Sequence, residues 1–333
     1  MEFTIGGRLE IRITPADVGK RVSVRRLLQE GPQGPKFTDT VGVLTSWDTG
    51  VLSVTPKSGD CVRIVESSLV AGKVVPSAPP RRRGPAASFD ELAAVCARAW
   101  QPVESEPLGD WLLRAAGGFT RRANSVLPLG DPGVPLDAAL ARVRQWYADR
   151  GLTPYVQTVT GAAGAQEELC AALEERGWRR EVTAEVRIAA LAPIGDLAAE
   201  VSRVRLSRTA DPAWLSRYQR FETPGPEVTA VLGSGPSVWF ATVPGEAGDA
   251  APAAIGRCVV DGRWAGFMAV EVAPEHRRRG LATTVMTALA RQAMDEGGSA
   301  AWLQVEAENE GARALYDGMG FSTHHRYHHF RPA

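Results

Sequence analysis

A run of arginines, glycine and small residues near the C-terminal end of the sequence could bind an anion. It reads Val272-Ala-Pro-Glu-His-Arg-Arg-Arg-Gly-Leu-Ala-Thr283, and a strand is expected to end at Val272 because Pro274 cannot continue a strand ladder. Gly280 would open a helix over Leu281–Glu296. The first turn of a helix leaves backbone N–H groups unpaired and carries positive potential, and arginines add charge-assisted hydrogen bonds. The pattern favours a bound phosphate group.

A second run of residues that could take part in a reaction follows a short distance downstream. It consists of a strand over Trp302–Val305, then Asn309, then a helix over Glu310–Met319 that carries Tyr316 and stops at Gly320. The phenol of Tyr316 could protonate a departing thiolate, because the intrinsic pKa values of the two groups are comparable, about 10 and 8.5. The alternative is an ordinary core aromatic on an amphipathic helix.

Together the two runs resemble the GNAT acetyltransferase superfamily. The superfamily signature Arg/Gln-x-x-Gly-x-Gly/Ala is matched by Arg277, Gly280 and Ala282. The resemblance implies that this loop holds the pyrophosphate of acetyl-CoA and that the strand Val270–Val272 pairs with the pantetheine arm. The residues that it places at the cofactor are Val270, Glu271, Val272, Arg277, Arg278, Arg279, Gly280, Leu281, Ala282, Thr283, Asn309 and Tyr316.

The resemblance also implies a reaction, the transfer of an acetyl group to a primary amine by direct attack in a ternary complex. Tyr316 would stand beside the thioester sulfur, and backbone N–H groups of Val270–Val272 would stabilise the oxyanion. The acceptor stays open among protein N-termini, lysine side chains, aminoglycosides, polyamines and amino sugars.

The general base is not fixed by the sequence. Some relatives use a glutamate where this chain has Gln304, and an amide cannot take a proton. Glu271 and Glu306 are the remaining nearby carboxylates. Strand alternation points Glu271 away from the side of Val270 and Val272, towards the acceptor. An ordinary surface carboxylate and a chain of waters stay open as alternatives.

The C-terminal tail contains four of the five histidines: His324, His325, His328 and His329. Imidazole binds zinc and nickel, but alternation along a strand would send the members of each pair to opposite faces. No cysteine or acidic residue is interleaved. We therefore predict no metal site, and one histidine beside the acceptor amine is a hypothesis.

Two stretches of the chain share one order of elements. In both, a long helix is followed by a strand, a second helix, a glycine stop and an aromatic residue, as in Gly177-Trp178 and Gly320-Phe321. The order indicates an ancient duplication. The earlier copy reads Pro128-Leu-Gly-Asp-Pro-Gly-Val-Pro-Leu-Asp137 where the later one has its arginines. It is predicted not to bind acetyl-CoA, and its string Gly117–Ser125 is expected to form a hairpin.

The first 76 residues predict short strands separated by turns. Arg21–Arg25, Thr40–Leu44, Val51–Thr55 and Cys61–Val65 are rich in β-branched residues, and Val18–Val22 with Trp47 resembles an SH3-like module. The predicted fold class is therefore α/β, with two GNAT-like mixed sheets in tandem after a small all-β barrel. The predicted parts are the barrel at 1–76, a Pro/Arg linker at 77–88, a degenerate GNAT-like domain at 89–192 and the catalytic domain at 193–333.

Bulk properties exclude some classes of protein. Lys and Arg number 38, Asp and Glu also 38, and this balance argues against a general nucleic-acid binder. No apolar run reaches the length of a membrane span, and the first residues do not form a signal peptide, so a cytoplasmic location is expected. The four cysteines are scattered and predict free thiols. A homodimer stays open.

Two other functions fit the same sequence. A non-catalytic sensor could bind acyl-CoA and regulate a partner, and Gln304 favours it, whereas Asn309 and Tyr316 favour catalysis. An adaptor could recruit a protein or nucleic acid through residues 1–76, which hold all four lysines.

Overall fold

The computed structural model describes residues 10–31, 34–75, 84–162, 164–218, 225–246 and 251–333. By their internal contacts these residues fall into two compact units. One lies within Met1–Arg81 and Thr158–Arg179, and the other within Arg82–Gln157 and Arg180–Ala333. Most of the predicted linker at 77–88 falls outside the described residues.

The N-terminal part forms a small antiparallel sheet of order β4-β3-β2-β1-β5. Its strands are β1 (Arg21–Gly31), β2 (Gly34–Asp48), β3 (Val51–Thr55), β4 (Val62–Val65) and β5 (Leu69–Val74). Thr49 and Gly50 adopt positive φ between β2 and β3, as a tight hairpin requires. The predicted all-β module is confirmed, but within the described residues β4 and β5 do not pair, so the sheet stays open rather than closing into a barrel.

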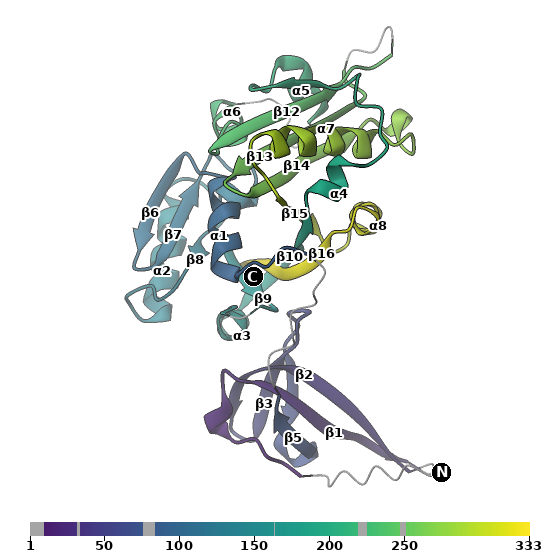
Figure 1. Ribbon diagram of the computed structural model, residues 1–333. Helices are drawn as coiled ribbons and strands as arrows, with labels where there is room; N and C mark the ends of the chain where they lie inside the picture. The colour runs from purple at the N-terminus through teal and green to yellow at the C-terminus, as the bar shows by residue number, and fades with distance from the viewer. Residues whose placement is uncertain (1–9, 32–33, 76–83, 163, 219–224, 247–250) are drawn as a thin grey trace, which may run out of the picture. The chain divides into compact units, whose positions relative to one another are not determined.

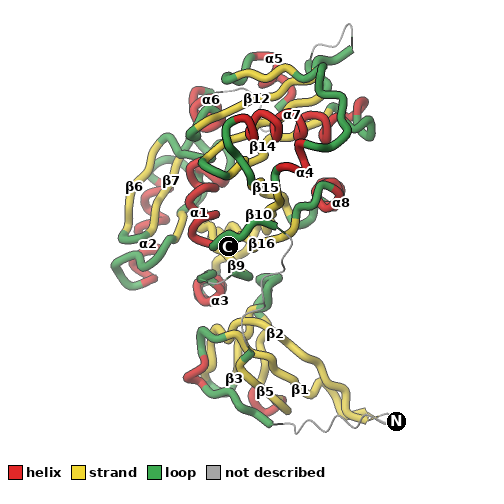
Figure 2. The backbone as a smooth tube through the Cα atoms, viewed as in Figure 1, coloured by secondary structure: helices red, strands yellow, loops and turns green. Residues whose placement is uncertain are grey.

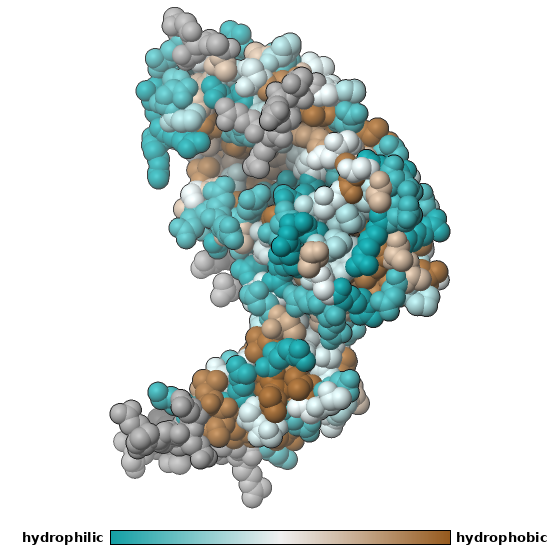
Figure 3. Space-filling view, turned by 180° about the vertical axis from the view of Figure 1, so that it is seen from behind, coloured by the Kyte–Doolittle hydropathy of each residue, from teal (hydrophilic) through white to brown (hydrophobic). Residues whose placement is uncertain are grey.

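The surface of this module exposes large apolar side chains, which the space-filling view shows in brown (Figure 3). The exposed ones are Ile11, Val18, Leu28, Phe37, Val41, Val65 and Val74. Its core is formed by others, among them Val22, Leu44 and Ile64, which have no solvent exposure.

The second architectural feature is an eight-stranded mixed sheet of order β11-β12-β13-β14-β15-β10-β16-β9. Its strands are β9 (Val156–Thr160), β10 (Trp178–Ala190), β11 (Arg205–Ser207), β12 (Ser237–Val243), β13 (Ala254–Asp261), β14 (Trp264–Val272), β15 (Ala300–Glu306) and β16 (Ser322–Pro332). A separate three-stranded sheet contains β6 (Glu104–Leu108), β7 (Trp111–Ala115) and β8 (Leu127–Pro128).

The helices cover the sheets as Figures 1 and 2 show. They are α1 (Phe89–Arg98), α2 (Leu136–Ala148), α3 (Glu167–Glu175), α4 (Ala192–Gly195), α5 (Pro212–Arg217), α6 (Pro226–Leu232), α7 (Leu281–Asp295) and α8 (Glu310–Gly318). Helix α7 packs on β12, β13 and β14 with α4 beside it. None of the helices in the described ranges is long and apolar enough to cross a membrane.

Two apolar clusters fill the two faces of the large sheet. The α7 face gathers Phe267, Leu303, Val285 and Leu289. The opposite face gathers side chains from α1, α5 and α6 with Ile255 and Trp302. Successive residues of β15 alternate between the clusters, since Ala301 and Leu303 belong to the first, and Ala300 and Trp302 to the second.

The predicted helices Leu281–Glu296 and Glu310–Met319 and the predicted strand Trp302–Val305 form close to these bounds. The pairing of the strands, however, differs from two separate sheets. Strand β10, from the predicted degenerate copy, pairs with β15 from Ala184↔Glu306 to Ala190↔Ala300. Strand β16 lies on the other side of β10. The two predicted copies therefore contribute strands to one sheet. The segment Gly117–Ser125 is also not a hairpin, because a 3-10 helix at Arg121–Ala123 interrupts it.

The histidines of β16 pack mainly as core residues, and the structure corrects one expectation about them. His325, His328 and His329 are buried. His324 and His325 do not separate to opposite faces, since their Nδ1 atoms lie 2.8 Å apart. Both rings turn towards the start of α1, where His324 bonds to Ala87 O and His325 stacks edge-on with Phe89.

The buried histidines predict a pH-dependent stability. Burial lowers the pKa of His325 and of His328 to about 3, and that of His329 well below its ordinary value. The unfolded state therefore binds more protons below pH 6.5, so this stabilisation is complete above pH 6.5 and is lost as pH falls towards 3. Between pH 7 and pH 5 the free energy of unfolding should fall by about 2 kcal/mol per histidine.

Urea denaturation at the two pH values measures this change. His328→Asn should remove about a third of the pH slope. An equal free energy of unfolding at pH 5 and pH 7 would contradict the burial of neutral imidazoles.

Candidate functional site

The central feature of the site is a divergence between β14 and β15. The two strands pair in parallel only from Trp264↔Ala300 to Phe267↔Leu303. Beyond that point β14 stays with β13 as far as Val272, and β15 stays with β10 as far as Glu306. The sheet thus splits into two arms, and the backbone edge of β14 after Phe267 faces the gap instead of a neighbouring strand.

A β-bulge in β14 accompanies this divergence. Ala269 has φ of 51°, and the register with β13 shifts between Ile255 and Arg257. Gly256 lies opposite the bulge, and a Cβ there would approach Val285 Cγ1 to 2.4 Å, so glycine lets α7 pack closely. A bulge inserts one residue and bends its strand, which turns the end of β14 away from β15.

The bulge also decides which side chains face which side. Met268 and Ala269 both pack on the face opposite α7, so alternation restarts one residue late. Val270 and Val272 then reach the α7 face, and Glu271 falls on the opposite face. Without the inserted residue, Glu271 would point towards α7.

The predicted anion loop connects β14 to α7. Gly280 has φ of 78° at the N-cap of α7, and Arg278 has φ of 62°. No side chain caps the helix, and the N–H groups of Leu281, Ala282 and Thr283 lie in its first turn, where no intrahelical acceptor exists. The loop therefore presents unpaired donors at the positive end of a long helix.

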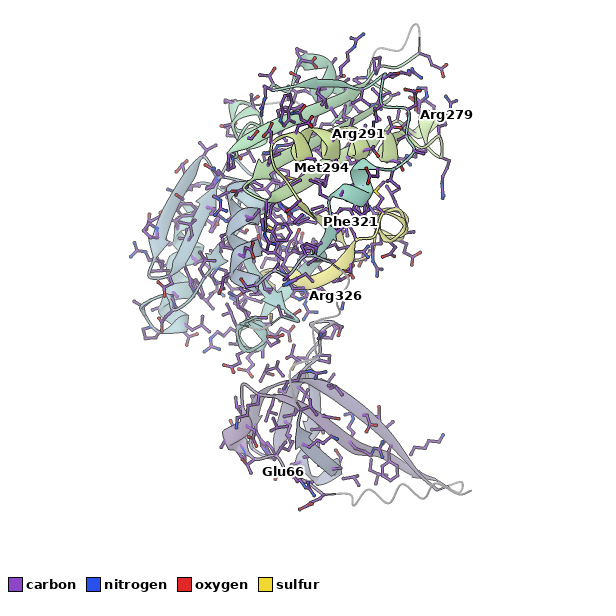
Figure 4. All side chains as sticks on the ribbon, viewed as in Figure 1. Glu66, Arg279, Arg291, Met294, Phe321 and Arg326 are labelled. Atoms are coloured by element: carbon purple, nitrogen blue, oxygen red, sulfur yellow. The ribbon has the colours of Figure 1, made fainter. Side chains whose placement is uncertain are left out.

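The three arginines of the loop are exposed around these donors. Arg279 donates to Glu246 Oε1 at 3.0 Å and lies 3.2 Å from His276 Nδ1. Figure 4 shows it beyond the first turn of α7, with Arg291 and Met294 towards the other end. Arg277 Nε lies 3.5 Å from Val272 O. Their charge can reach a ligand at the helix N-terminus.

Tyr316 on α8 joins the same apolar cluster as Val270, Val272 and Leu281. Its ring meets Phe321 at 5.8 Å between centroids. Its hydroxyl makes no hydrogen bond to any residue that the structure describes. Burial raises the pKa of Tyr316 to about 12, against a smaller lowering by Arg187. The phenol is therefore protonated across the physiological range.

Buried charges hold α8 against the sheet. Arg187 of β10 donates to Arg313 O at 3.1 Å and Phe321 O at 3.2 Å, and pairs with Asp317. Glu185 is buried with Thr323 Oγ1 donating at 3.0 Å and Arg326 Nη2 at 3.3 Å. Because these bonds span both ends of α8, they fix the helix that carries Tyr316.

The structure gives Asn309 a local role. Its side chain accepts from Ala312 N at 3.0 Å and caps α8, and this use leaves its amide NH₂ group for another partner. Asn309 lies on the exposed surface. Its contact with the cofactor stays a prediction.

The face opposite α7 carries the polar groups near the divergence. Gln304 and Glu306 share this face with Trp302, as does Glu271. Gln304 Oε1 is shielded from solvent and accepts no hydrogen bond from the described residues. The sequence did not identify Arg122, which reaches this side from the 3-10 helix Arg121–Ala123. Only the string around it was distinctive.

Within the described ranges no three His, Cys, Asp or Glu side chains gather to hold an ion. The site combines apolar side chains of β14, α7 and α8 with cationic donors at one end, a protonated phenol and carboxylates across the sheet.

Comparisons with known proteins indicate the family of this chain. A family model described as "Probable histone acetyltransferase Rv0428c C-terminal" matches residues 87–330. A second model, the N-terminal Sm-like domain of the same protein, matches residues 16–73. This Sm-like description is compatible with the small all-β module, for which the sequence suggested an SH3-like one.

Individual relatives extend this finding. The "Probable histone acetyltransferase Rv0428c" of Mycobacterium tuberculosis is 28% identical over 314 residues, covering 92% of this chain and 93% of the relative. The N-acetyltransferase YobR of Bacillus subtilis is 27% identical over 252 residues, covering 72% and 96%.

Solved structures show the same fold. A GCN5-related N-acetyltransferase from Kribbella flavida has a TM-score of 0.52 at 17% identity, covering 74% of this chain and 96% of that one. A tandem GNAT protein from the clavulanic acid biosynthesis pathway has a TM-score of 0.51 at 15% identity, covering 74% and 89%. With a family model that matches most of its length, this chain belongs to the Rv0428c family of GNAT N-acetyltransferases.

Proposed function

We propose that the protein transfers the acetyl group of acetyl-CoA to a primary amine by direct attack in a ternary complex. The divergence of β14 from β15 carries the proposal, because it opens a strand edge between an anion loop and Tyr316. An extended amide chain ending in a pyrophosphate matches such a strand edge beside an anion loop. Its amides can pair with the strand edge, and its phosphates with the helix N-terminus.

The residues present fit this substrate. The N–H groups of Leu281 to Thr283 and the side chains of Arg277, Arg278 and Arg279 would hold the pyrophosphate. A Cβ added to Gly280 would meet no atom within 4 Å, so the role of this glycine is conformational, at a φ that favours glycine. Val270, Val272 and Tyr316 would lie along the pantetheine arm.

In the proposed reaction the two faces of β14 have different roles, since one holds the thioester and the other accepts the amine proton. A neutral amine attacks the thioester carbonyl, a C–N bond forms, the C–S bond breaks, and the amine proton passes to Glu271 or a water beside it. Backbone N–H groups at the end of β14 stabilise the oxyanion. Tyr316 donates to the departing thiolate. Its raised pKa favours a hydrogen bond to sulfur over complete proton transfer.

We also propose that residues 193–333 carry catalysis and that residues 89–192 are a degenerate copy. Helix α2 begins after Pro135 with no side-chain cap. Asp131 and Asp137 lie near its start, where a phosphate would meet like charge. The degenerate copy would contribute strand β10 and part of the acceptor side.

A sensor that binds acyl-CoA without turnover is the second candidate, and Gln304 favours it because an amide replaces a potential base. The mycobacterial relative is named a probable histone acetyltransferase, and protein lysines therefore belong among the acceptors to test. Turnover with any amine would exclude the sensor.

Binding of acetyl-CoA to the loop is the first prediction. Calorimetric titration should give a micromolar Kd, and an Arg279→Glu, Gly280→Asp double variant should weaken it at least about 100-fold, because an anion replaces a cation at the helix N-terminus. Arg142→Gln, whose exposed side chain pairs with Glu106, is the control. Equal affinities would remove the cofactor from this loop.

Tyr316→Phe should lower kcat about 100-fold and leave the Kd of acetyl-CoA within about twofold, because the hydroxyl acts on the leaving group. Steady-state kinetics with a responsive amine, together with calorimetry, measure both. Unchanged kcat would make Tyr316 a packing residue only.

Glu271→Gln should lower kcat/KM about 100-fold at pH 7, and Glu306→Gln should lower it much less, if Glu271 takes the amine proton. Raising the pH should partly restore the Glu271→Gln variant, since deprotonated amine is then supplied by the solution. The reverse ranking of the two variants would assign the proton to Glu306, and equal activity in both would favour waters.

A further inference from the structure

The degenerate copy places one arginine on the acceptor side of the catalytic sheet. Arg122 follows a turn at Gly117–Thr120 and comes from the short helix Arg121–Ala123. Its Nε donates to Tyr327 Oη of β16 at 3.0 Å. Its guanidinium lies over the rings of Trp100 at 5.6 Å and Tyr327 at 5.9 Å. Arg122, from the proposed degenerate copy, is thus held by two aromatic side chains beside the proposed catalytic copy.

The turn that presents Arg122 is held rigidly. Asn124 Oδ1 accepts from Ala116 N at 2.8 Å and Gly118 N at 2.9 Å. Asn124 Nδ2 donates to Phe119 O and Thr120 O. Thr120 has φ of 52°, a conformation that β-branched residues rarely adopt. Strain of this kind persists where surrounding bonds over-determine the backbone, and it marks functional sites.

Arg122 has binding capacity that the fold does not use. Its two terminal nitrogens have neither a hydrogen bond nor an ion pair with any described residue. Burial pulls the pKa of Arg122 down, but Tyr327, Tyr218 and Glu306 raise it overall, so the guanidinium stays charged. A half-buried guanidinium with both terminal nitrogens available suits a planar, bidentate oxyanion.

The opposite charge stands close to it on the same face. Glu306 contributes electrostatically to Arg122 without lying within ion-pair distance. Two residues earlier on β15, Gln304 offers a shielded Oε1 that accepts no hydrogen bond from described residues, and Glu271 shares this face across the divergence. On this face of the sheet, Glu271 and Gln304 would attract a cation or an N–H donor, and Arg122 would attract an anion.

We propose that the acceptor is a small amine that carries a carboxylate, with its amino group between Gln304 and Glu271 and its carboxylate on Arg122. The inference rests on the proposed acetyl transfer and specifies its substrate class. A dianionic phosphate fits less well, because Glu306 and Glu271 would repel the second charge. In a zwitterionic amino acid, the single negative charge of the carboxylate would pair with Arg122, and the positive charge of the amino group would lie near the glutamates.

The test compares matched pairs of amines. Each pair contains an amino acid, with its amine on the α carbon or further along the chain, and the corresponding carboxamide. Wild-type protein should show kcat/KM at least 10-fold higher for the acid of a pair. Arg122→Gln should remove this preference, mainly through KM, while the Kd of acetyl-CoA stays within about twofold. Arg122→Lys should keep only part of it, because an ammonium lacks the planar fork, and Arg142→Gln is the matched control.

A binding measurement tests the same proposal without turnover. Protein loaded with CoA is titrated by calorimetry with N-acetylated amino acids and with their carboxamides. Tighter binding of the acids that Arg122→Gln abolishes supports the proposal. Equal use of acids and amides, binding of neither product, or a preference for phosphorylated amines overturns it.

The two hypotheses fail in different ways. If intact protein binds no acetyl-CoA, the proposed function is wrong. If it binds acetyl-CoA and acetylates acids and amides alike, or acetylates only lysines within proteins, only the assignment of Arg122 is wrong.

Discussion

The inserted residue at Ala269 is the constraint on which the site depends. In a regular strand, β14 would continue beside β15 and every backbone group would find a partner. The bulge gives up that pairing after Phe267, and it shifts the alternation so that Val270 and Val272 face α7 while Glu271 faces away. One backbone irregularity therefore leaves the strand edge that the proposed cofactor site needs, and it separates apolar side chains from a carboxylate. Gly256 allows it by keeping β13 and α7 close.

Buried charged side chains have different partners on the two sides of the sheet. On the α7 side, Arg187 pairs with Glu185 and Asp317 and donates to the backbone carbonyls of Arg313 and Phe321, and these bonds hold α8 in place. On the other side, Arg257 has no solvent exposure and donates to three carbonyls, Leu232 O, Ala99 O and Ser234 O. It also lies 5.0 Å from the ring of Trp100, so the ring that supports Arg122 is itself fixed.

The sequence was sufficient for the local elements and for the loop. Gly280, Pro274 and the arginines specify a strand end, a turn and a helix start within a dozen residues, and such local chemistry is readable from residue types. The bulge at Ala269 was not readable, because alanine seldom adopts positive φ and nothing in its neighbours requires it. Nor was Arg122, since its partners Trp100 and Tyr327 are distant in sequence. The pairing of β10 with β15 was missed because periodicity identifies strands and not their neighbours.

The shared sheet has a consequence for how the chain matures. Strand β10 is made more than 100 residues before its partner β15, which borders the divergence on one side. During synthesis the earlier copy therefore carries an unsatisfied strand edge until the later copy emerges. Contacts between segments so distant in sequence form slowly, and exposed edges of this kind invite association with other chains. The shared sheet thus makes the folding of residues 89–192 depend on strands that lie more than 100 residues later.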